Sequence, residues 1–536
     1  MGVKVGRQES LASQWFACLF LGALAVLPAA VQGHNVVQQR EKQNQNLDHD
    51  NHSSAPGPKN GSTVEAACLA AQECLGEDQV QIRPGVDDAV VDENWSQTCW
   101  TEPYCIILPR NASEVSRSLQ VIGSHSVHFA VRSGGHSPNP GWASIGSEGL
   151  LLDLQRIAGV GFSADGTFAS IGPGARWGDV YASVDAATAS SAIVAGGRVP
   201  GIGVGGLVLG GGISHLSNQF GLVADSARGF EVALANGSVV DATSEANVDL
   251  FWALKGGGPN FGIVTRYDLS TLPISKLWVQ VSAYAVLDAP AVIAAFDTWQ
   301  LEGSSDVRSN IEVIISLDYV AVVLIYSEPA AEPPAAFAAF FNESGVQPAV
   351  VNLPGTNVTF NELSIILGSV VSSEPARHDY RGASSRVDTE LTQAVYNFWL
   401  EKAVEIRNTT GANQTFVLQH IGSNLIHQGL NNGGNPLNIP AGDQQWWTTT
   451  IDWSQAADDD LVRSASIETT RKWAELGSKR GSDLSFLYMN DASRDQNPLA
   501  SYGSESLERL KQIALRYDPD QLFQTLQNGG FLLSKA

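Results

Sequence analysis

The segment VRSGGHSPNPGW, residues 131–142, places His136 directly after two glycines and just before a proline-rich turn. Glycine has no Cβ atom, so paired glycines mark a point where the backbone approaches another group closely. The overlapping run SVHFAVRS (126–133) alternates polar and apolar side chains, which predicts a strand. Taken alone, the GGH motif indicates no more than a histidine that caps a turn at the end of this strand.

A second glycine-rich segment, GGRVPGIGVGGLVLGGGISHLSNQFGL, covers residues 196–222. It contains a formal GxGxxG at 201–206, and Asp225 follows at about the distance expected in a Rossmann fold. A dinucleotide fingerprint should follow a strand and open a helix, but GGRVP interrupts the approach and glycines 210–212 stand where the helix should continue. We therefore predict extended backbone without Cβ atoms, against which a flat or phosphorylated group lies.

Motifs of other enzyme classes are missing from the sequence. No serine has glycines two residues before and two residues after it, and there is no HExxH, P-loop or EF-hand motif. His125 and His128 are three residues apart, and on an alternating strand they would point to opposite faces. We expect these two histidines to be structural, and we predict no metal site.

The composition indicates a globular protein with two or three lobes. Over 536 residues, 43% are hydrophobic and 16% are charged. The 55 acidic residues exceed the 32 basic residues, which gives a formal net charge of −23. Such a surface repels phosphate backbones and anionic lipid, so we expect neither nucleic acid nor membrane partners.

The N-terminus has the pattern of a secretory signal, which we assign to residues 1–33. Lys4 and Arg7 precede the apolar run WFACLFLGALAVL (15–27). That run is shorter than the roughly 20 residues that span a bilayer, and no later segment is long and apolar enough to do so. Residues 34–63 are mostly polar and are expected to form a flexible tail. We predict a secreted, soluble protein.

The cysteines and the glycosylation sequons favour the same compartment. Beyond the signal segment the cysteines are Cys68, Cys74, Cys99 and Cys105, which allow three pairings in disulfides. In an exported chain, thiols at this spacing are expected to form disulfides and not to bind a metal. Sequons occur at Asn51, Asn60, Asn94, Asn111, Asn236, Asn342, Asn357, Asn408 and Asn413.

Short β-type runs alternate with helical runs between residues 106 and 273. Strands are predicted at GLLLDL (149–154) and FGIVTRYDL (261–269), and helices at RWGDVYASVDAATA (176–189) and NVDLFWALKGGG (247–258). The run FEVALANGSVVDAT contains Asn-Gly between two apolar stretches, which predicts a β-hairpin.

The pattern changes from residue 275 to that of an α+β lobe with antiparallel strands. NIEVIISLDYVAVVLIYS (310–327) predicts paired strands, and QQWWTTTIDW (444–453) predicts another strand. PPAAFAAFFNES (333–344) and TELTQAVYNFWLEKAVEI (389–406) predict amphipathic helices. The last helix, within 507–523, is expected to end at Asp518-Pro519.

Several of these motifs together resemble a known family. VRSGGHS, GVGGLVLGGGIS, FGLVADS and LFWALKGGGPNFGIVTRYDL resemble the PCMH-type FAD-binding domain of the vanillyl-alcohol oxidase and p-cresol methylhydroxylase family. YMNDA and LRYDPDQLFQTLQNGGF resemble the berberine-bridge-enzyme module. The likeness extends from about residue 95 to residue 531 and is greatest to secreted, oxygen-dependent fungal FAD-linked oxidoreductases.

The resemblance implies an α+β fold with three parts. Residues 64–274 would form a two-subdomain PCMH-type FAD-binding domain, and residues 275–484 an α+β substrate domain with an antiparallel sheet. Residues 485–536 would form a berberine-bridge-like C-terminal segment that packs back on the FAD domain.

The resemblance also implies a role for His136, which would bond covalently to the 8α-methyl group of the flavin through a neutral imidazole. Many relatives carry a second link through a cysteine, but Val199 stands at that position and no cysteine follows Cys105. The FAD would therefore be monocovalent.

Further cofactor contacts are implied by the same motifs. The turn that would hold the pyrophosphate through backbone N–H groups comprises Arg132, Ser133, Gly134, Gly135 and Ser137. The residues implied along the flavin, at the adenine end and from the C-terminus are Gly203, Gly205, Gly206, Gly211, Gly212, Phe261, Gly262, Ile263, Val264, Asn490 and Asn528.

The substrate site is less clearly indicated. In this family a base takes a proton from the substrate while a hydride leaves the neighbouring carbon. Tyr488 is one candidate, as a base or as a hydrogen-bonding group, and Asp491, which stands where many relatives have tyrosine, is another. His420 would either face the flavin or be a buried structural histidine, and Trp446 and Trp447 would line the pocket.

These inferences predict a secreted, monomeric FAD oxidoreductase. It would transfer a hydride from an alcohol or related C–H of a small secondary metabolite to the flavin, with O₂ as the final acceptor and hydrogen peroxide as product. One alternative is an oxidase of mono- or oligosaccharides. Another is a flavoprotein that assists a non-redox cyclisation.

Overall fold

The computed structural model describes residues 61–536 except 343–344, 370–373 and 375. The expected signal segment, residues 34–60 of the polar tail, and the sequons at Asn51 and Asn60 lie outside the described residues. Within the described part, no helix is both long and apolar enough to cross a membrane. The predicted α+β class is confirmed, because helices cover three separate sheets.

The first sheet carries the turn that contains His136. Its strand order is β1-β2-β4-β3, with β2, β4 and β3 parallel and β1 antiparallel to β2. The strands are β1 (Val80–Ile82), β2 (Cys105–Ile107), β3 (His128–Arg132) and β4 (Gly149–Asp153), and the helices beside them are α2 (Gly61–Leu75), α3 (Asp88–Val91) and α4 (Ala112–His125). The turn follows the carboxyl end of β3, where parallel strands commonly present their binding residues.

His125 does not lie on a strand, contrary to the prediction from its spacing to His128. It is the last residue of α4, which ends because Ser126 adopts a left-handed conformation with φ of 49°. Its Nδ1 lies 3.0 Å from the carbonyl oxygen of Val121 within that helix, and His128 Nδ1 lies 3.2 Å from Leu526 O. Both histidines are thus held by backbone carbonyls, and the described residues contain no cluster suited to a metal.

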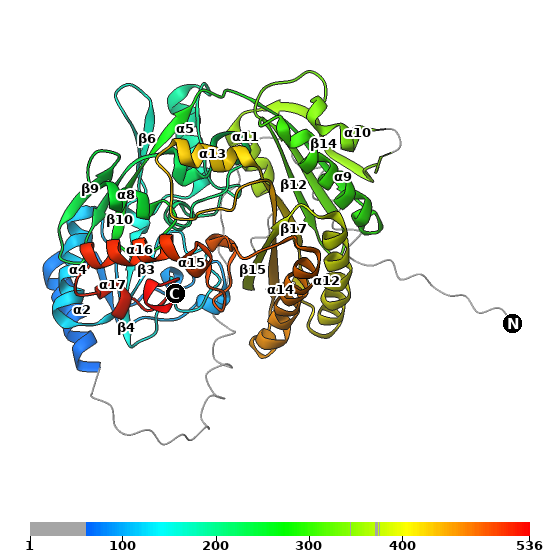
Figure 1. The fold of residues 1–536 in the computed structure, drawn as a ribbon. Coiled ribbons are helices and arrows are strands. Elements are labelled where there is room, and N and C mark those ends of the chain that lie inside the picture. Colours follow the sequence, from blue (N-terminus) through cyan, green and yellow to red (C-terminus); the bar gives the residue numbers. More distant parts are fainter. Residues whose placement is uncertain (1–60, 343–344, 370–373, 375) are drawn as a thin grey trace, which may run out of the picture. The chain divides into compact units, whose positions relative to one another are not determined.

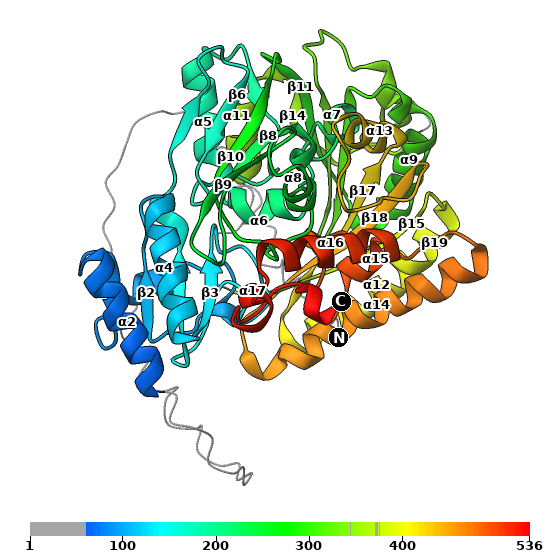
Figure 2. The same ribbon diagram turned by 60° about the vertical axis from the view of Figure 1, so that its left-hand side comes forward.

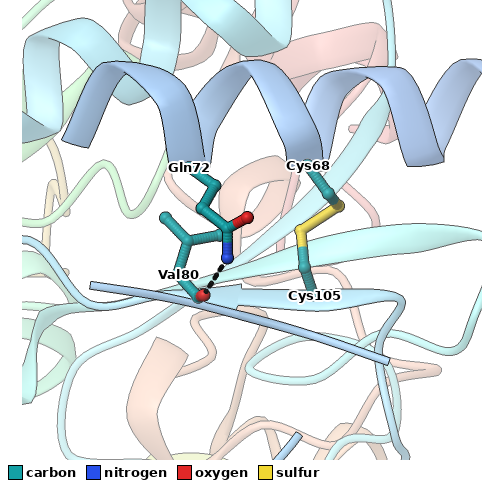
Figure 3. The surroundings of a disulfide bond; sticks show 4 residues. All are labelled: Cys68, Gln72, Val80 and Cys105. Carbon is teal, nitrogen blue, oxygen red and sulfur yellow. Dashed lines mark hydrogen bonds between the residues drawn. A yellow bond between two sulfur atoms is a disulfide. The ribbon is translucent and has the colours of Figure 1, made fainter. Parts of the chain in front are cut away.

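Two of the four cysteines expected to form disulfides do so, and the other two do not, so none of the three complete pairings is present among the described residues. A disulfide joins Cys68 on α2 to Cys105 on β2 (Figure 3), and both residues are fully buried. Beside it, Gln72 Nε2 donates to Val80 O at 3.2 Å, so the helix is also joined to the edge strand. Cys74 is exposed and Cys99 is buried, and both are free thiols.

The second sheet has the order β5-β6-β10-β8-β9, and β7 also pairs with β10. The predicted hairpin about Asn236-Gly237 is confirmed by antiparallel β8 and β9. The elements are β5 (Val160–Phe162), β6 (Phe168–Ile171), α5 (Trp177–Thr188), β7 (Ile193–Val194), β8 (Ala227–Ala233), β9 (Val239–Thr243), α8 (Val248–Leu254) and β10 (Ile263–Leu272).

The sequence predicted an extended backbone for the glycine-rich segment between β7 and β8, but this prediction is wrong in part. The segment forms two short helices, α6 (Val204–Leu209) and α7 (Ser217–Phe220). Gly210 ends α6, and Gly211 and Gly212 follow with φ of 104° and 81°, which only glycine adopts readily. The glycine triplet therefore limits the helix to six residues and turns the chain back, as its helix-breaking character requires.

The third sheet is antiparallel and belongs to the second lobe. Its order is β14-β11-β13-β12-β17-β18-β15-β19, with β16 paired to β18. The strands are β11 (Leu277–Tyr284), β12 (Ser309–Ile315), β13 (Val320–Tyr326), β14 (Val350–Val358), β15 (Arg377–Arg386), β16 (Asn413–Gln414), β17 (Phe416–Ile421), β18 (Gln444–Trp453) and β19 (Asp483–Leu484). The predicted strands at 310–327 and 444–453 are confirmed.

Helices cover one face of this sheet, and the other face points to the glycine-rich segments. On the covered face, α9 (Ala289–Leu301), α12 (Thr389–Thr410) and α14 (Asp459–Arg480) pack over a core that includes Trp399, Trp447 and Trp473 (Figure 1). The remaining helices of this lobe are α10 (Ala338–Phe341), α11 (Phe360–Gly368) and α13 (Ser423–Asn431).

The C-terminal segment returns to the first sheet. Phe129 on β3 accepts from Asn528 N at 2.8 Å and donates to Leu526 O at 3.0 Å, so the chain end is tied to the strand before the His136 turn. Figure 2 shows the last helices beside α8 and β3. They are α15 (Pro498–Ser501), α16 (Ser504–Tyr517) and α17 (Leu522–Thr525), and the single turn Met489–Asp491 precedes them.

Removing the Cys68–Cys105 bridge should lower the stability of the protein. The bridge joins residues 37 positions apart, and closing a loop of that length stabilises a fold by about 4 kcal/mol. We expect the double variant Cys68→Ser/Cys105→Ser to lose up to that free energy of unfolding, measured by denaturant titration. Cys74→Ser removes an exposed free thiol and is the control. An equal loss in both variants would contradict the assignment of the bridge.

Candidate functional site

The two glycine-rich segments meet at one close backbone contact. A Cβ atom on Gly134 would lie 2.3 Å from Gly203 Cα, and a Cβ on Gly203 would lie 2.5 Å from Gly134 Cα. Neither position can hold a larger residue without moving backbone. The turn after β3 and the start of α6 are thereby fixed against each other.

Side chains on both sides hold this contact in place. Arg176 Nη1 donates to Gly134 O at 2.9 Å and to Gly201 O at 2.7 Å, so one guanidinium spans both segments. Ser133 Oγ accepts from Gly205 N at 3.2 Å and donates to the carbonyl of Pro173. Arg176 precedes α5 and belongs to no motif, so nothing in the sequence identified it.

The turn offers a set of free backbone donors. Among the residues that the structure describes, the N–H groups of 134–137 donate to no protein acceptor. Gly135 has φ of 65°, and successive N–H groups in such a turn form a concave site for an anion. Cβ positions built on Gly201 and Gly206 meet open space, which leaves room beside the second segment. The residues therefore fit the phosphates and the flat ring system of a flavin cofactor.

The side chain of Arg132 does not point into this turn. Its guanidinium is buried, donates to the carboxylate of Asp153 with Nε at 2.8 Å, and also donates to Val90 O at 2.6 Å. Arg132 thus holds β3 to β4 just below the turn. Its Nη1 has no hydrogen-bond partner among the residues that the structure describes.

The imidazole of His136 lies in an aromatic stack. It packs on Trp95 with ring centroids 4.3 Å apart, and Trp95 packs with its other face on His378 at 3.7 Å. Tyr380 Oη lies 3.0 Å from His136 Nδ1. Burial, with added effect from His378 and Arg176, lowers the pKa of His136 to about 3, so the imidazole is neutral at physiological pH.

Four neighbouring strands of the third sheet present side chains to the same space. The side chains are those of Glu312 on β12, Gln419 on β17, Trp446 on β18 and Tyr380 on β15. Paired residues such as Gln419 and Trp446 share a face, since cross-strand partners in an antiparallel sheet point the same way. This uncovered face of the sheet is the wall of the site opposite the glycine-rich segments.

Asp491 joins this wall from the C-terminal segment. Gln419 Nε2 donates to Asp491 Oδ2 at 2.7 Å, and Gln419 Oε1 accepts from Arg198 Nη2 at 2.6 Å. Arginine has donors only, so it forces the amide oxygen of Gln419 toward itself and the amide NH₂ toward Asp491. Burial raises the pKa of Asp491 to about 6, although Arg198 and Gln419 act in the opposite direction.

A second carboxylate keeps the charge of Arg198 balanced. Glu312 Oε1 lies 3.5 Å from Arg198 Nη1 and 2.8 Å from His215 Nδ1. Burial raises the pKa of Glu312, but His215 and Arg198 outweigh it and hold the pKa at about 2. Glu312 is therefore ionised, whereas Asp491 can take up and release a proton near neutral pH.

Tyr488 and Asn490 lie together between the wall and α6. The Tyr488 ring stacks on Trp446 with centroids 5.1 Å apart. Its hydroxyl accepts from Asn490 Nδ2 at 3.0 Å, and the same nitrogen donates to Leu207 O at 3.0 Å. Burial and the charge of Asp491 raise the pKa of Tyr488 well above 10, so its hydroxyl is a hydrogen-bond donor and a poor base.

His420 and Trp447 do not share this site: His420 takes the structural alternative, and Trp447 does not line the pocket as expected. They alternate along their strands with Gln419 and Trp446 and therefore point to the helix-covered face. Trp447 packs against Trp473, and the His420 ring lies edge-on to Trp299. Burial also lowers the pKa of His420 to about 4.

The other predicted cofactor residues lie around the two segments. Asn528 Nδ2 donates to Gly141 O at 2.8 Å in the loop after His136. Ile263 and Val264 begin β10 and pair with β8, and a Cβ on Gly262 would lie 2.6 Å from Val232 Cγ1. Phe261 is fully buried. Their contacts with a cofactor stay predictions.

Sequence reasoning missed the residues that complete the site from the second lobe. Tyr380, Gln419 and Glu312 stand in ordinary strand patterns, and Trp95 precedes the first recognisable motif. Arg198 was the one residue with a positional clue, since it directly precedes Val199 in the glycine-rich segment.

Comparison with known proteins agrees with this geometry. Residues 103–243 match a family described as an FAD binding domain. An FAD-dependent monooxygenase of Arthrobotrys oligospora is 36% identical over 87% of this chain and 89% of its own length. The bifunctional solanapyrone synthase of Alternaria solani is 30% identical over 96% of this chain and 99% of its own.

Solved structures share the fold at lower identity. The 6-hydroxy-D-nicotine oxidase of Arthrobacter nicotinovorans has a TM-score of 0.70 at 20% identity and covers 84% of this chain and 97% of its own. The berberine bridge enzyme of Eschscholzia californica has a TM-score of 0.71 at 18% identity and covers 86% of this chain and 98% of its own.

Alanine at two glycines should have different effects. Gly134→Ala places a Cβ against Gly203 backbone and should lower the free energy of unfolding by about 1–3 kcal/mol. Gly206→Ala meets open space within α6 and should preserve stability, yet reduce flavin content if the cofactor lies there. The measurements are denaturant unfolding and flavin absorbance per protein. Full flavin content in stable Gly206→Ala protein would place the cofactor elsewhere.

Proposed function

Because the chain belongs to the FAD-linked oxidoreductases with a vanillyl-alcohol-oxidase-type FAD-binding domain and a berberine-bridge-like C-terminus, we propose that it oxidises a small secondary metabolite. FAD held by the glycine-rich segments would supply a hydride acceptor for the substrate carbon, with O₂ as the final electron acceptor. The names of the fungal relatives, among them a synthase of solanapyrone, favour a metabolite as substrate.

The observation that carries this proposal is the position of Asp491. It is hydrogen-bonded to Gln419, near Arg198, on the wall that faces the glycine-rich segments. A carboxylate with a pKa of about 6 is half converted to its basic form slightly below neutral pH, which suits proton removal from a substrate hydroxyl. Gln419 orients this carboxylate, and Tyr488 offers a hydroxyl donor beside it.

We assign the covalent link of the flavin to His136. Its neutral imidazole is able to act as a nucleophile, and the free N–H groups of residues 134–137 lie in the same turn for the phosphates. Val199 stands where many relatives have the second linking cysteine, which supports a single link.

A monooxygenase reaction is the second candidate, because several relatives bear that name. The two reactions differ in the fate of the oxygen atoms. An oxidase releases one hydrogen peroxide per substrate oxidised, whereas a monooxygenase places one atom of labelled O₂ in the product. Mass spectrometry of the product after turnover under ¹⁸O₂ separates them.

We further propose that the protein is secreted and glycosylated and acts as a monomer. The Cys68–Cys105 disulfide supports an oxidising compartment. Asn111, Asn236, Asn357, Asn408 and Asn413 are exposed and are suited to carry glycans. Asn94 is not suited, since it is 3% exposed and its Nδ2 donates to Cys99 O.

Acid precipitation tests the covalent link. Flavin colour should remain with the precipitated wild-type protein, and His136→Ala should release its flavin wholly into the supernatant. Because bound ligand stabilises a fold, His136→Ala should also unfold at lower temperature when free FAD is scarce. Flavin in the wild-type supernatant would refute the link.

Replacing Asp491 tests the proposed base. Asp491→Asn should slow anaerobic bleaching of the flavin by substrate about 10²- to 10⁴-fold. The substrate is first found by screening small alcohols and phenols for peroxide release. In the wild type the bleaching rate should rise with pH around 6 as Asp491 loses its proton, and the variant should lack this rise.

Asp297→Asn is the matched control for this experiment. Burial also raises the pKa of Asp297 to about 6, but its carboxylate lies on α9 and accepts from Gln300, on the helix-covered side of the sheet. The control should bleach at the wild-type rate. Equal slowing in both variants would show that Asp491 acts only on the fold.

A further inference from the structure

The imidazole of His136 is held from the second lobe as well as from its own turn. Trp95 lies between the rings of His136 and His378, with interplanar angles of 10° and 4°. Trp95 N donates to Gly135 O at 2.9 Å, which ties the indole to the glycine turn. The ring of His136 is therefore held parallel to the indole of Trp95, which is itself fixed to the glycine turn.

The same stack is tied to the start of β15. His378 N donates to Ser96 Oγ at 2.8 Å, and Gln97 N donates to Ala376 O at 2.9 Å. These bonds place the side chains of His378 and Tyr380, two residues apart on one face of β15, beside His136. A strand of the substrate lobe thus reaches the residue assigned to the flavin link.

Tyr380 is the residue of this strand that touches a ring nitrogen. Its hydroxyl lies 3.0 Å from His136 Nδ1, whereas His378 Nδ1 has no hydrogen-bond partner within the described residues. Burial, then the charges of Asp491 and Asp452, raise the pKa of Tyr380 far above its ordinary value. The phenol stays protonated: its oxygen accepts from the Nδ1–H of His136, and as it takes that proton it releases its own to solvent, so it is able to relay the ring proton.

Attachment of a flavin requires that the imidazole lose a proton. An imidazole nitrogen forms a bond to the 8α carbon, while one C–H bond of the 8α-methyl and the imidazole N–H bond break. The two protons and the electron pair of the C–H bond end on O₂, which becomes hydrogen peroxide. A partner at the ring that fixes the tautomer and takes the N–H proton should speed this step.

We propose that Tyr380 is the positioning residue for covalent flavin attachment at His136: its hydroxyl holds the imidazole in one tautomer and carries away the ring proton. This inference rests on the proposed link at His136. It also makes attachment depend on the substrate lobe, because the hydroxyl is supplied by β15. Flavin would then become covalent only in a chain whose two lobes have closed correctly on each other.

The test is Tyr380→Phe in the full chain, which removes one oxygen and keeps the ring in the stack. Total flavin is measured by absorbance of the purified protein, and covalent flavin by absorbance of the acid-precipitated pellet. We expect total flavin to stay near the wild-type value and the covalent fraction to fall at least fivefold. On incubation with O₂ the fraction should recover slowly, and faster at higher pH, since solvent base replaces the lost acceptor.

Tyr326→Phe is the matched control, because its hydroxyl also bonds a side chain, Asp306 Oδ2 at 3.0 Å, in the same lobe but away from His136. It should show the wild-type covalent fraction. An unchanged covalent fraction in Tyr380→Phe overturns the proposal. A parallel loss of total and covalent flavin also overturns it, because Tyr380 would then serve only the fold.

The outcome separates this inference from the proposed link. If wild-type flavin is covalent and His136→Ala abolishes it, the link stands whatever Tyr380→Phe shows. If wild-type flavin is released by acid, the link fails and the role of Tyr380 fails with it.

Discussion

The backbones of Gly134 and Gly203 pass so closely that neither residue has room for a Cβ atom, and the site is built around this contact. It joins the turn after β3 to the segment that opens α6, with Arg176 bonded to carbonyls on both sides. Within the described residues the N–H groups of 134–137 have no protein acceptor and remain free for a ligand. Glycine is thus required at these positions because two main-chain segments are in direct contact there, and this contact constrains the conformations of the turn and of α6.

The opposite wall of the site is set by the alternation of an antiparallel sheet. One face of β15, β17 and β18 packs against helices, and the other carries Tyr380, Gln419 and Trp446 toward the glycine segments. A shift of one residue exchanges these faces, which is why His420 and Trp447 lie in the helix-covered core although each is adjacent to a site residue. The sequence pointed to β17 and β18 through His420, Trp446 and Trp447, but neither to β15 nor to the face on which each residue lies.

The charged groups of the site are paired so that one carboxyl group, that of Asp491, can change its protonation near neutral pH. Arg198 contacts both Glu312 and Gln419. Because Arg198 donates to the amide oxygen of Gln419, the amide NH₂ of Gln419 is directed to the carboxylate of Asp491. Glu312 is held ionised by Arg198 and by its hydrogen-bonded partner His215, whereas Asp491 has an amide as its direct partner and keeps a raised pKa. Two acidic groups in one site therefore have different protonation behaviour for a structural reason.

The sequence by itself determined the α+β class, through local periodicity, and the glycine turn before His136, through residue placement, while the resemblance of its motifs indicated the FAD-binding family. Tertiary structure alone decided the Cys68–Cys105 pairing, the clamp by Arg176 and the meeting of His136 with Trp95 and Tyr380. The reason is distance along the chain. Tyr380 is 244 residues from His136, and no local pattern records which strand, or which face of it, a distant turn will meet.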